Sequence, residues 1–133
     1  TQALFRNQKS VITFLGARTA NQLVQTHLVN VHISTDDGSK GYHGNVVELM
    51  NVNYELFKDS RPKIYACGPT KMLHAVAEFA IGRNIPCEVS LEGPMACGFG
   101  ICQGCPVELI GEEKKYGLMC KDGPTFDVRR IRI

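Results

Sequence analysis

The stretch SLEGPMACGFGICQGC, from Ser90 to Cys105, determines how the C-terminal third of the chain must fold. It contains Cys97, Cys102 and Cys105, separated by four and then two residues, and Cys120 follows after a further fourteen residues. Glycines lie between the cysteines, and the apolar residues follow neither the period of a strand nor that of a helix. We therefore expect an irregular loop that directs three thiols inward, with a fourth thiol supplied by a later segment.

This spacing is the plant-type arrangement of ligands for a [2Fe–2S] cluster. Glycines permit the positive φ angles and the close backbone approach that such a loop needs if its N–H groups are to face the cluster sulfides. Two other interpretations of the same cysteines remain open. A structural zinc site usually takes its cysteines as two close pairs in sequence, and the four thiols could instead be free or form disulfides. The spacing favours the cluster, with Cys97, Cys102, Cys105 and Cys120 as its ligands.

Composition excludes several classes of protein. The 133 residues are 44% hydrophobic and 21% charged, which is unlike a disordered chain. A net charge of +2 is too balanced for a dedicated nucleic-acid or anionic-membrane binder, so we expect neither partner. No apolar run approaches the ~20 residues that span a bilayer, and the first ten residues lack the apolar core of a signal peptide. We expect a cytoplasmic protein in a reducing compartment.

Residues 1–90 are predicted to form an α/β domain, because short apolar runs alternate with segments of helical period. Such alternation with short loops is typical of a doubly wound parallel sheet. The predicted strands are residues 11–15, 29–34, 63–67 and 87–90. The predicted helices are residues 20–28, 44–57 and 69–82, the last with Pro69 at its first position and Gly82 at its end.

Residues 91–133 are predicted to form a second, smaller lobe, with short strands at residues 107–110, 116–120 and 127–133. About 40 residues bury too little apolar surface to offset the entropy of ordering them. A bound metal centre would supply the missing stability.

The cysteine motif resembles that of a known family. Ser90 to Cys105, together with CKDGPTF from Cys120 to Phe126, is similar to the iron–sulfur electron-transfer subunits of NAD-linked dihydroorotate dehydrogenases, in the ferredoxin–NADP reductase superfamily. LGAR at residues 15–18, STDDGS at residues 34–39 and ACGP at residues 66–69 extend the resemblance over nearly the whole chain. The gamma subunits of hydrogenases and sulfhydrogenases share much of the pattern.

The resemblance implies an electron-transfer function in pyrimidine biosynthesis. Electrons would pass between NAD(P) and FAD, and then through the [2Fe–2S] cluster to a flavin-containing catalytic partner subunit. It places Cys67 near the nicotinamide ring, with Gly68 and Pro69 beside it. It also makes Gly16, Arg18 and Asp36 candidates for contact with the nucleotide. Before this region the family usually carries a flavin-binding barrel and the first strand of the nicotinamide-nucleotide domain, with its glycine-rich phosphate loop. None of these is found in the 133 residues, so we expect a sheet of the ferredoxin reductase type that lacks its central first strand. We expect that the 133 residues form part of a longer protein whose other residues bind most of the FAD.

Each nucleotide candidate also has a simpler structural interpretation. Cys67 could be a buried cysteine at the end of a strand, and Arg18 a surface arginine after a turn. Asp36 lies in Asp-Asp-Gly-Ser, which is ordinary turn chemistry. Cys87 is predicted to be a core residue. For the whole chain, the alternatives are a hydrogenase-type gamma subunit and a zinc-stabilised binding module without redox activity.

Overall fold

The computed structural model describes residues 1–111 and 113–133, which fold as two compact units, Thr1–Lys58 and Asp59–Ile133. The helices are α1 (Gln2–Arg6), α2 (Val46–Val52), α3 (Thr70–Gly82) and α4 (Met119–Asp122). The strands are β1 (Thr13–Ala17), β2 (Val31–Thr35), β3 (Tyr42–His43), β4 (Ile64–Cys67), β5 (Cys87–Ser90), β6 (Pro106–Glu108), β7 (Tyr116–Leu118) and β8 (Thr125–Asp127).

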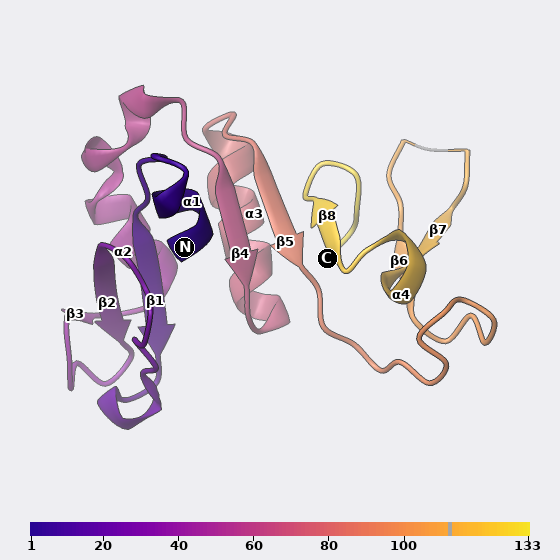
Figure 1. The fold of residues 1–133 in the computed structure, drawn as a ribbon, viewed down its shortest axis with the longest axis horizontal. Coiled ribbons are helices and arrows are strands. Elements are labelled where there is room, and N and C mark those ends of the chain that lie inside the picture. The colour runs from indigo at the N-terminus through magenta and orange to yellow at the C-terminus, as the bar shows by residue number, and fades with distance from the viewer. Residues whose placement is uncertain (112) are drawn as a thin grey trace. The chain divides into compact units, whose positions relative to one another are not determined.

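In the first unit, β1, β2 and β3 form a parallel sheet in that order, with Gly16 opposite Ser34. Helix α2 packs against β1 and β2 (Figure 1). The helix begins at a capping box, in which Asn45 accepts from the N–H groups of Val47 and Glu48, and Glu48 accepts from the N–H of Asn45. The carboxyl ends of β1 and β2 lie side by side because Ala17 pairs with Thr35.

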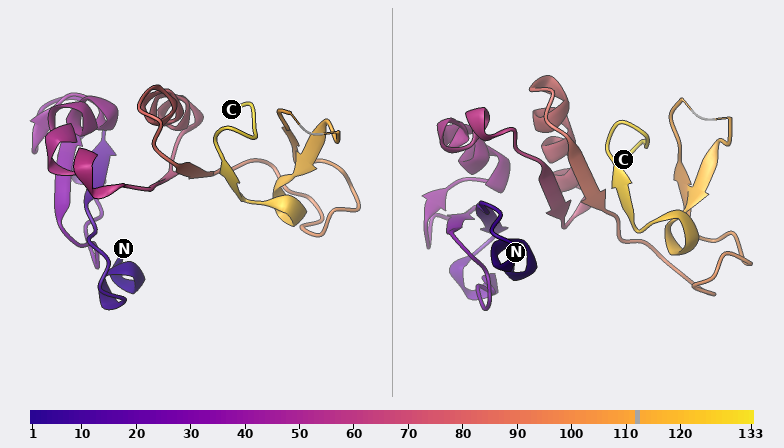
Figure 2. Two further views of the ribbon diagram at one scale, coloured as in Figure 1. Left: turned by 90° about the horizontal axis from the view of Figure 1, so that it is seen from above. Right: turned by 45° about the horizontal axis from the view of Figure 1, so that its top comes forward.

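In the second unit, β4 and β5 are parallel, and β8 joins the other edge of β5 in antiparallel orientation. Helix α3 lies against one face of β4 and β5 (Figure 2). Its apolar stripe includes Leu73 and Ala80, which are almost completely buried, as is Val89 in β5. The stripe and the end of the helix at Gly82 agree with the sequence prediction.

The C-terminal residues of the second unit form an antiparallel β6–β7 hairpin followed by the single turn α4. Strand β8 comes next and pairs with β5, so the C-terminal residues complete the sheet that β4 and β5 begin. This pairing explains why the boundary between the compact units lies at Lys58. The division into residues 1–90 and 91–133 stays a prediction.

The predicted alternation of strands and helices is confirmed in part. The strands within residues 1–90 pair in parallel as expected, whereas β8 and the β6–β7 hairpin are antiparallel. Among the described residues the strands form two three-stranded sheets and the hairpin rather than one doubly wound sheet. The helix predicted at residues 20–28 is wrong: a short 3-10 turn at Ala20–Gln22 gives way to extended backbone at Leu23. Val24 in this segment is 73% exposed, so no apolar face stabilises a helix there.

The strand predicted at residues 127–133 is also displaced. It is replaced by β8 at Thr125–Asp127 and one isolated bridge between Leu109 and Ile131. None of the helices among the described residues is both long and apolar enough to cross a bilayer.

Candidate cluster site

The cysteine loop runs between β5 and β6 without regular secondary structure, as the sequence predicts. Gly98 and Gly100 have φ angles of 76° and 90°, which a side chain with a Cβ rarely adopts. Gln103 is also left-handed, and its side-chain amide donates to the carbonyl of Gly100 at 2.8 Å. These turns bend the loop so that its N–H groups point toward cysteine sulfurs.

The structure arranges the four predicted ligands as two pairs. In the first pair, the N–H of Cys102 donates to Sγ of Cys97 at 3.5 Å, and the N–H of Gly104 donates to Sγ of Cys102 at 3.4 Å. In the second pair, the Sγ atoms of Cys105 and Cys120 lie 3.3 Å apart. Cys97 and Cys120 are both half-buried, whereas Cys102 is exposed and Cys105 is buried. One pair therefore lies nearer the surface than the other.

The two pairs differ in their electrostatic surroundings. The N–H groups of Cys102 and Phe99 point at the Cys97 sulfur and lower the pKa of Cys97 to about 6. The hydrogen bond shared with Cys105, followed by desolvation and by repulsion from that neighbouring sulfur, raises the pKa of Cys120. Thiolates are the metal-binding form of cysteine, and a cation between Cys105 and Cys120 would relieve their repulsion.

This donor set fits an iron–sulfur centre with two metal ions. A binuclear cluster takes two thiolates at each iron and accepts N–H donors at sulfur, which matches two sulfur pairs in a loop rich in N–H···S contacts. Four thiolates are also the donor set of a structural zinc site.

Two backbone contacts bring Cys120 to Cys105. The N–H of Met119 donates to the carbonyl of Cys105 at 2.9 Å, and Oδ2 of Asp122 accepts from the N–H of Leu118 at 2.7 Å. The Leu118 N–H and the ammonium of Lys114 hold the pKa of Asp122 below its usual range. Sequence reasoning missed Asp122, although its place two residues after a ligand cysteine was a usable signal.

Three large apolar side chains of the cysteine loop are exposed, and sequence reasoning also missed these. Met95, Phe99 and Ile101 are 54%, 67% and 75% exposed. Their signal in the sequence was the presence of bulky apolar residues in a stretch with no strand or helix period.

Cys67 and its neighbours lie at the carboxyl end of β4. Cys67 is exposed, so its interpretation as a buried core cysteine is wrong, and its thiol donates weakly to Glu92 at 3.9 Å. Gly68 has a φ of 152°, and a Cβ there would lie 2.7 Å from Cε of Met72. Pro69 precedes α3 and its carbonyl accepts from the N–H groups of Met72 and Leu73. A cavity of about 170 Å³ adjoins this strand end and is lined by Tyr65, Ala66, Cys67, Glu88, Ser90 and Thr125.

The remaining nucleotide candidates belong to the first unit. Arg18 and Asp36 are both exposed, and each follows the carboxyl end of a strand, β1 or β2 respectively. Gly16 packs against α2, where a Cβ would lie 2.8 Å from Cβ of Val46. The turn chemistry expected after β2 is present, because Oδ1 of Asp37 accepts from the N–H and the hydroxyl of Ser39 at 2.9 and 2.6 Å.

Cys87 is 1% exposed and is a core residue, as predicted. Burial, together with the nearby carboxylate of Asp127, raises the pKa of Cys87 to about 11. The thiol is therefore neutral over the physiological range and is a poor nucleophile.

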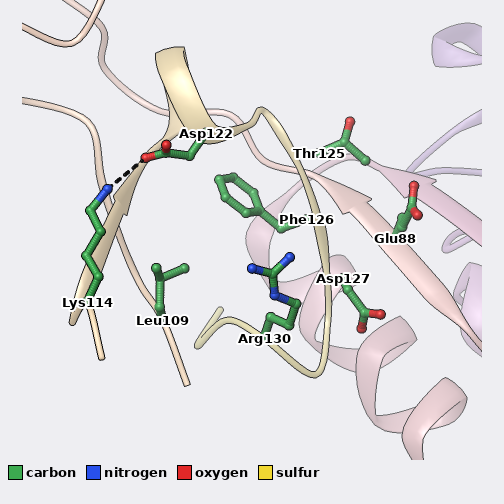
Figure 3. A pocket seen from close by; sticks show the side chains of 8 residues that line it. All are labelled: Glu88, Leu109, Lys114, Asp122, Thr125, Phe126, Asp127 and Arg130. Carbon is green, nitrogen blue, oxygen red and sulfur yellow. Dashed lines mark hydrogen bonds and ion pairs between the residues drawn. The ribbon is translucent and has the colours of Figure 1, made fainter. Parts of the chain in front are cut away.

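A larger cavity, of about 490 Å³, lies in the second unit. Figure 3 shows Lys114 and Asp122 pointing toward each other at its edge, with Phe126 beside them. Its lining residues are Glu88, Leu109, Lys114, Asp122, Thr125, Phe126, Asp127 and Arg130.

Comparison with known proteins assigns the C-terminal region to a class. Residues 92–132 match the family described as the iron–sulfur cluster binding domain of dihydroorotate dehydrogenase B. This match covers all four predicted ligand cysteines, and it defines the region as an iron–sulfur cluster-binding domain.

The chain belongs to the family of the electron transfer subunits of dihydroorotate dehydrogenase B, and it corresponds to their C-terminal portion. It is 36% identical over 122 residues to a probable electron transfer subunit of dihydroorotate dehydrogenase B (NAD(+)) from Thermoplasma acidophilum, covering 89% of this chain and 44% of that protein. The probable subunit of Methanocaldococcus jannaschii is 40% identical over 121 residues, covering 87% and 44%. The chain thus spans less than half the length of these relatives.

A solved structure resembles the chain over almost its whole length. It is that of an NADH-dependent reduced ferredoxin-NADP oxidoreductase, described in connection with flavin-based electron bifurcation. The TM-score is 0.79 at 28% identity, and the match covers 98% of this chain and 47% of that one.

Proposed function

We propose that the chain is part of an electron transfer subunit of an NAD-linked dihydroorotate dehydrogenase, which acts in pyrimidine biosynthesis. The observation that carries this proposal is the pairing of Cys97 with Cys102 and of Cys105 with Cys120, within residues that match the cluster-binding family. A [2Fe–2S] cluster held there would carry one electron at a time between a flavin and a catalytic partner subunit.

The chain's own residues would hold the cluster and tune it. Cys97 and Cys102 would bind one iron near the surface, and Cys105 and Cys120 the other iron further inside. The N–H groups of Cys102 and Gly104 stabilise negative charge on sulfur, which favours binding of the thiolate form. Hydrogen bonds to sulfur and the degree of exposure are the means by which a protein sets the potential of such a centre.

The nicotinamide nucleotide would bind at the carboxyl ends of the parallel strands, where open α/β sheets bind ligands. Exposed Cys67, with Gly68 and Pro69 at the start of α3, would lie near the nicotinamide ring. Within the first unit, Gly16, Arg18 and Asp36 at the ends of β1 and β2 are separate candidates for contact with a nucleotide. A glycine is needed at position 16 because a Cβ there would meet Val46, whether or not a nucleotide binds. Arg18 is therefore the stronger candidate for a nucleotide contact. FAD would be bound mainly by the part of the relatives' length that these 133 residues do not span.

The experiment that tests this proposal is anaerobic purification of the full-length subunit with its cluster. We expect two irons and two acid-labile sulfides per chain, and a paramagnetic signal after one-electron reduction. Addition of the catalytic subunit and dihydroorotate should then reduce NAD+. A colourless protein that contains zinc, and that takes up no iron and sulfide on anaerobic reconstitution, would instead establish the zinc-stabilised binding module.

One observation favours a second candidate, the corresponding subunit of another flavin-based oxidoreductase. It is the structural likeness to the NADH-dependent ferredoxin-NADP oxidoreductase over 98% of this chain. The gamma subunit of a hydrogenase belongs to this alternative through the sequence resemblance alone. Parallel assays separate the two, because oxidation of dihydroorotate by the assembled complex supports the first and oxidation of hydrogen the second.

A further inference from the structure

The short turn that carries Cys120 is fastened by a single carboxylate. Oδ2 of Asp122 accepts from the N–H of Leu118 at 2.7 Å and from Nζ of Lys114 at 3.3 Å. Figure 3 shows Asp122 and Lys114 joined across the edge of the cavity. Asp122 therefore connects the end of the turn to Leu118 at its beginning and to Lys114, which precedes β7. Cys120 lies between the connected residues.

The hairpin leaves the N–H of Leu118 without a partner on β6. Across the hairpin the N–H of Met119 donates to the carbonyl of Cys105 and the N–H of Leu109 to that of Lys115. Because hydrogen-bonded and non-hydrogen-bonded pairs alternate in an antiparallel ladder, Leu118 and Pro106 form a non-hydrogen-bonded pair and the Leu118 N–H points away from β6. Leu118 is also the residue that precedes α4, and its side chain forms no hydrogen bond that caps the helix. The carboxylate of Asp122 thus supplies a contact that the sheet and the helix start do not.

The fastened residues lead directly to the ligand. The N–H of Met119 donates to the carbonyl of Cys105, and the side chains of Leu118 and Met119 are buried. Cys120 follows, with its sulfur 3.3 Å from that of Cys105. A shift of the Leu118 backbone would therefore move the Cys120 sulfur relative to Cys105.

We propose that Asp122 is the positioning residue for Cys120, acting through the backbone of Leu118 to hold that sulfur where an iron can bind both Cys120 and Cys105. The inference rests on the proposed function, because it needs the cluster. Outer partners that orient metal ligands typically change metal affinity by about 10- to 100-fold when removed.

Asp127 offers a matched control. It lies in the same unit, lines the same cavity, and its Oδ1 accepts from a backbone N–H, that of Arg129, at 2.9 Å. Asp127→Ala removes the same kind of bond from a segment that carries no cysteine. Lys114→Gln removes only the ammonium partner of Asp122, and Asp122→Asn keeps an oxygen that accepts from Leu118 while losing the ion pair.

The experiment measures each variant in the full-length subunit after anaerobic reconstitution with iron and sulfide. The readouts are the rate at which a chelator bleaches the cluster, the electron paramagnetic resonance spectrum after reduction, and thermal stability. We expect Asp122→Ala to bleach about 10-fold faster and to show a changed spectrum. Lys114→Gln and Asp122→Asn should keep the wild-type spectrum and bleach within about twofold of the wild-type rate.

Each outcome decides the inference. A wild-type spectrum and bleaching rate in Asp122→Ala would overturn it, as would equal changes in Asp127→Ala. If Asp122→Ala does not fold, Asp122→Glu replaces it, because the extra methylene displaces the acceptor while keeping the charge. A wild-type spectrum and rate in that variant would overturn the inference. If the wild-type full-length subunit takes up no iron and sulfide, both the proposed function and this inference are wrong.

Discussion

The Sγ atoms of Cys105 and Cys120 lie 3.3 Å apart, although fourteen residues and a hairpin separate the two cysteines along the chain. Cys105 immediately precedes β6 and Cys120 follows β7, so the antiparallel pairing of these strands brings the two thiols together. The pair of Cys105 and Cys120 therefore depends on the hairpin, whereas Cys97 and Cys102 both lie within one loop.

Replacement of Cys120 by serine should remove one ligand without removing the hairpin. We expect the Cys120→Ser variant to retain about one tenth or less of the wild-type iron and sulfide after anaerobic reconstitution. Proteases should also cut more readily within residues 91–105, because metal binding contributes to ordering that loop. Metal analysis and limited proteolysis measure the two effects.

Cys87→Ser is the control for this change. Its side chain is buried away from the candidate ligands, so the variant should keep its cluster absorbance per folded chain. A hydroxyl buried there without a partner costs ~1–3 kcal/mol of stability. Equal loss of iron in the two variants would contradict the ligand assignment.

Cys67→Ser in the full-length subunit should slow hydride transfer from NADH to the flavin by about 10-fold or more, because small displacements of a reacting ring are costly in rate. Since Cys67 is exposed, the substitution should leave cluster content and melting temperature almost unchanged. Stopped-flow reduction of the flavin measures the rate. An unchanged rate would remove Cys67 from the nicotinamide site.

Gly68→Ala should destabilise the second unit by about 1–3 kcal/mol, because the residue has a φ of 152° and its new Cβ would meet Met72. Chemical denaturation provides the free energy of unfolding. Gly82→Ala is the matched control at the other end of α3. A Cβ there meets nothing within 4 Å, so we expect it to be neutral or to stabilise by up to about 1 kcal/mol. Similar effects at both glycines would be inconsistent with strain at Gly68.

The buried thiol of Cys87 should make stability decrease at alkaline pH. Burial raises the pKa of Cys87 from 9.0 to about 11, so the unfolded chain releases this proton at lower pH than the folded chain. The contribution to stability is complete below pH 9 and is lost as the pH rises through about 11. Denaturation of the wild type and of Cys87→Ala at several pH values measures it. The same slope between pH 9 and 11 in both proteins would rule out this assignment.

Several features could be predicted from local sequence because local forces determine them. The helix at residues 70–82 follows from an apolar stripe at helical spacing. The strand at residues 87–90 follows from the alternation of Cys87 and Val89, which are buried, with two polar residues. The irregular loop at residues 91–105 follows from its glycines, two of which adopt the positive φ angles expected of them. The four candidate ligands were likewise identified from spacing, because three of them must share one loop.

Other features depend on contacts between distant segments. Strand β8 forms at residues 125–127 because β5 offers an unpaired edge there, and local composition cannot indicate which residues that edge will bind. Residues 20–28 have some helical character but no apolar face packs against them, so they turn instead. The pairing of Cys105 with Cys120 likewise depends on the β6–β7 hairpin. So does the hydrogen bond from the Leu118 N–H to Asp122, which holds the turn that carries Cys120. The sequence alone thus determined which cysteines are available as ligands. Only the tertiary structure decided how they pair, because strand register, and not spacing along the chain, sets the distance between the sulfurs of Cys105 and Cys120.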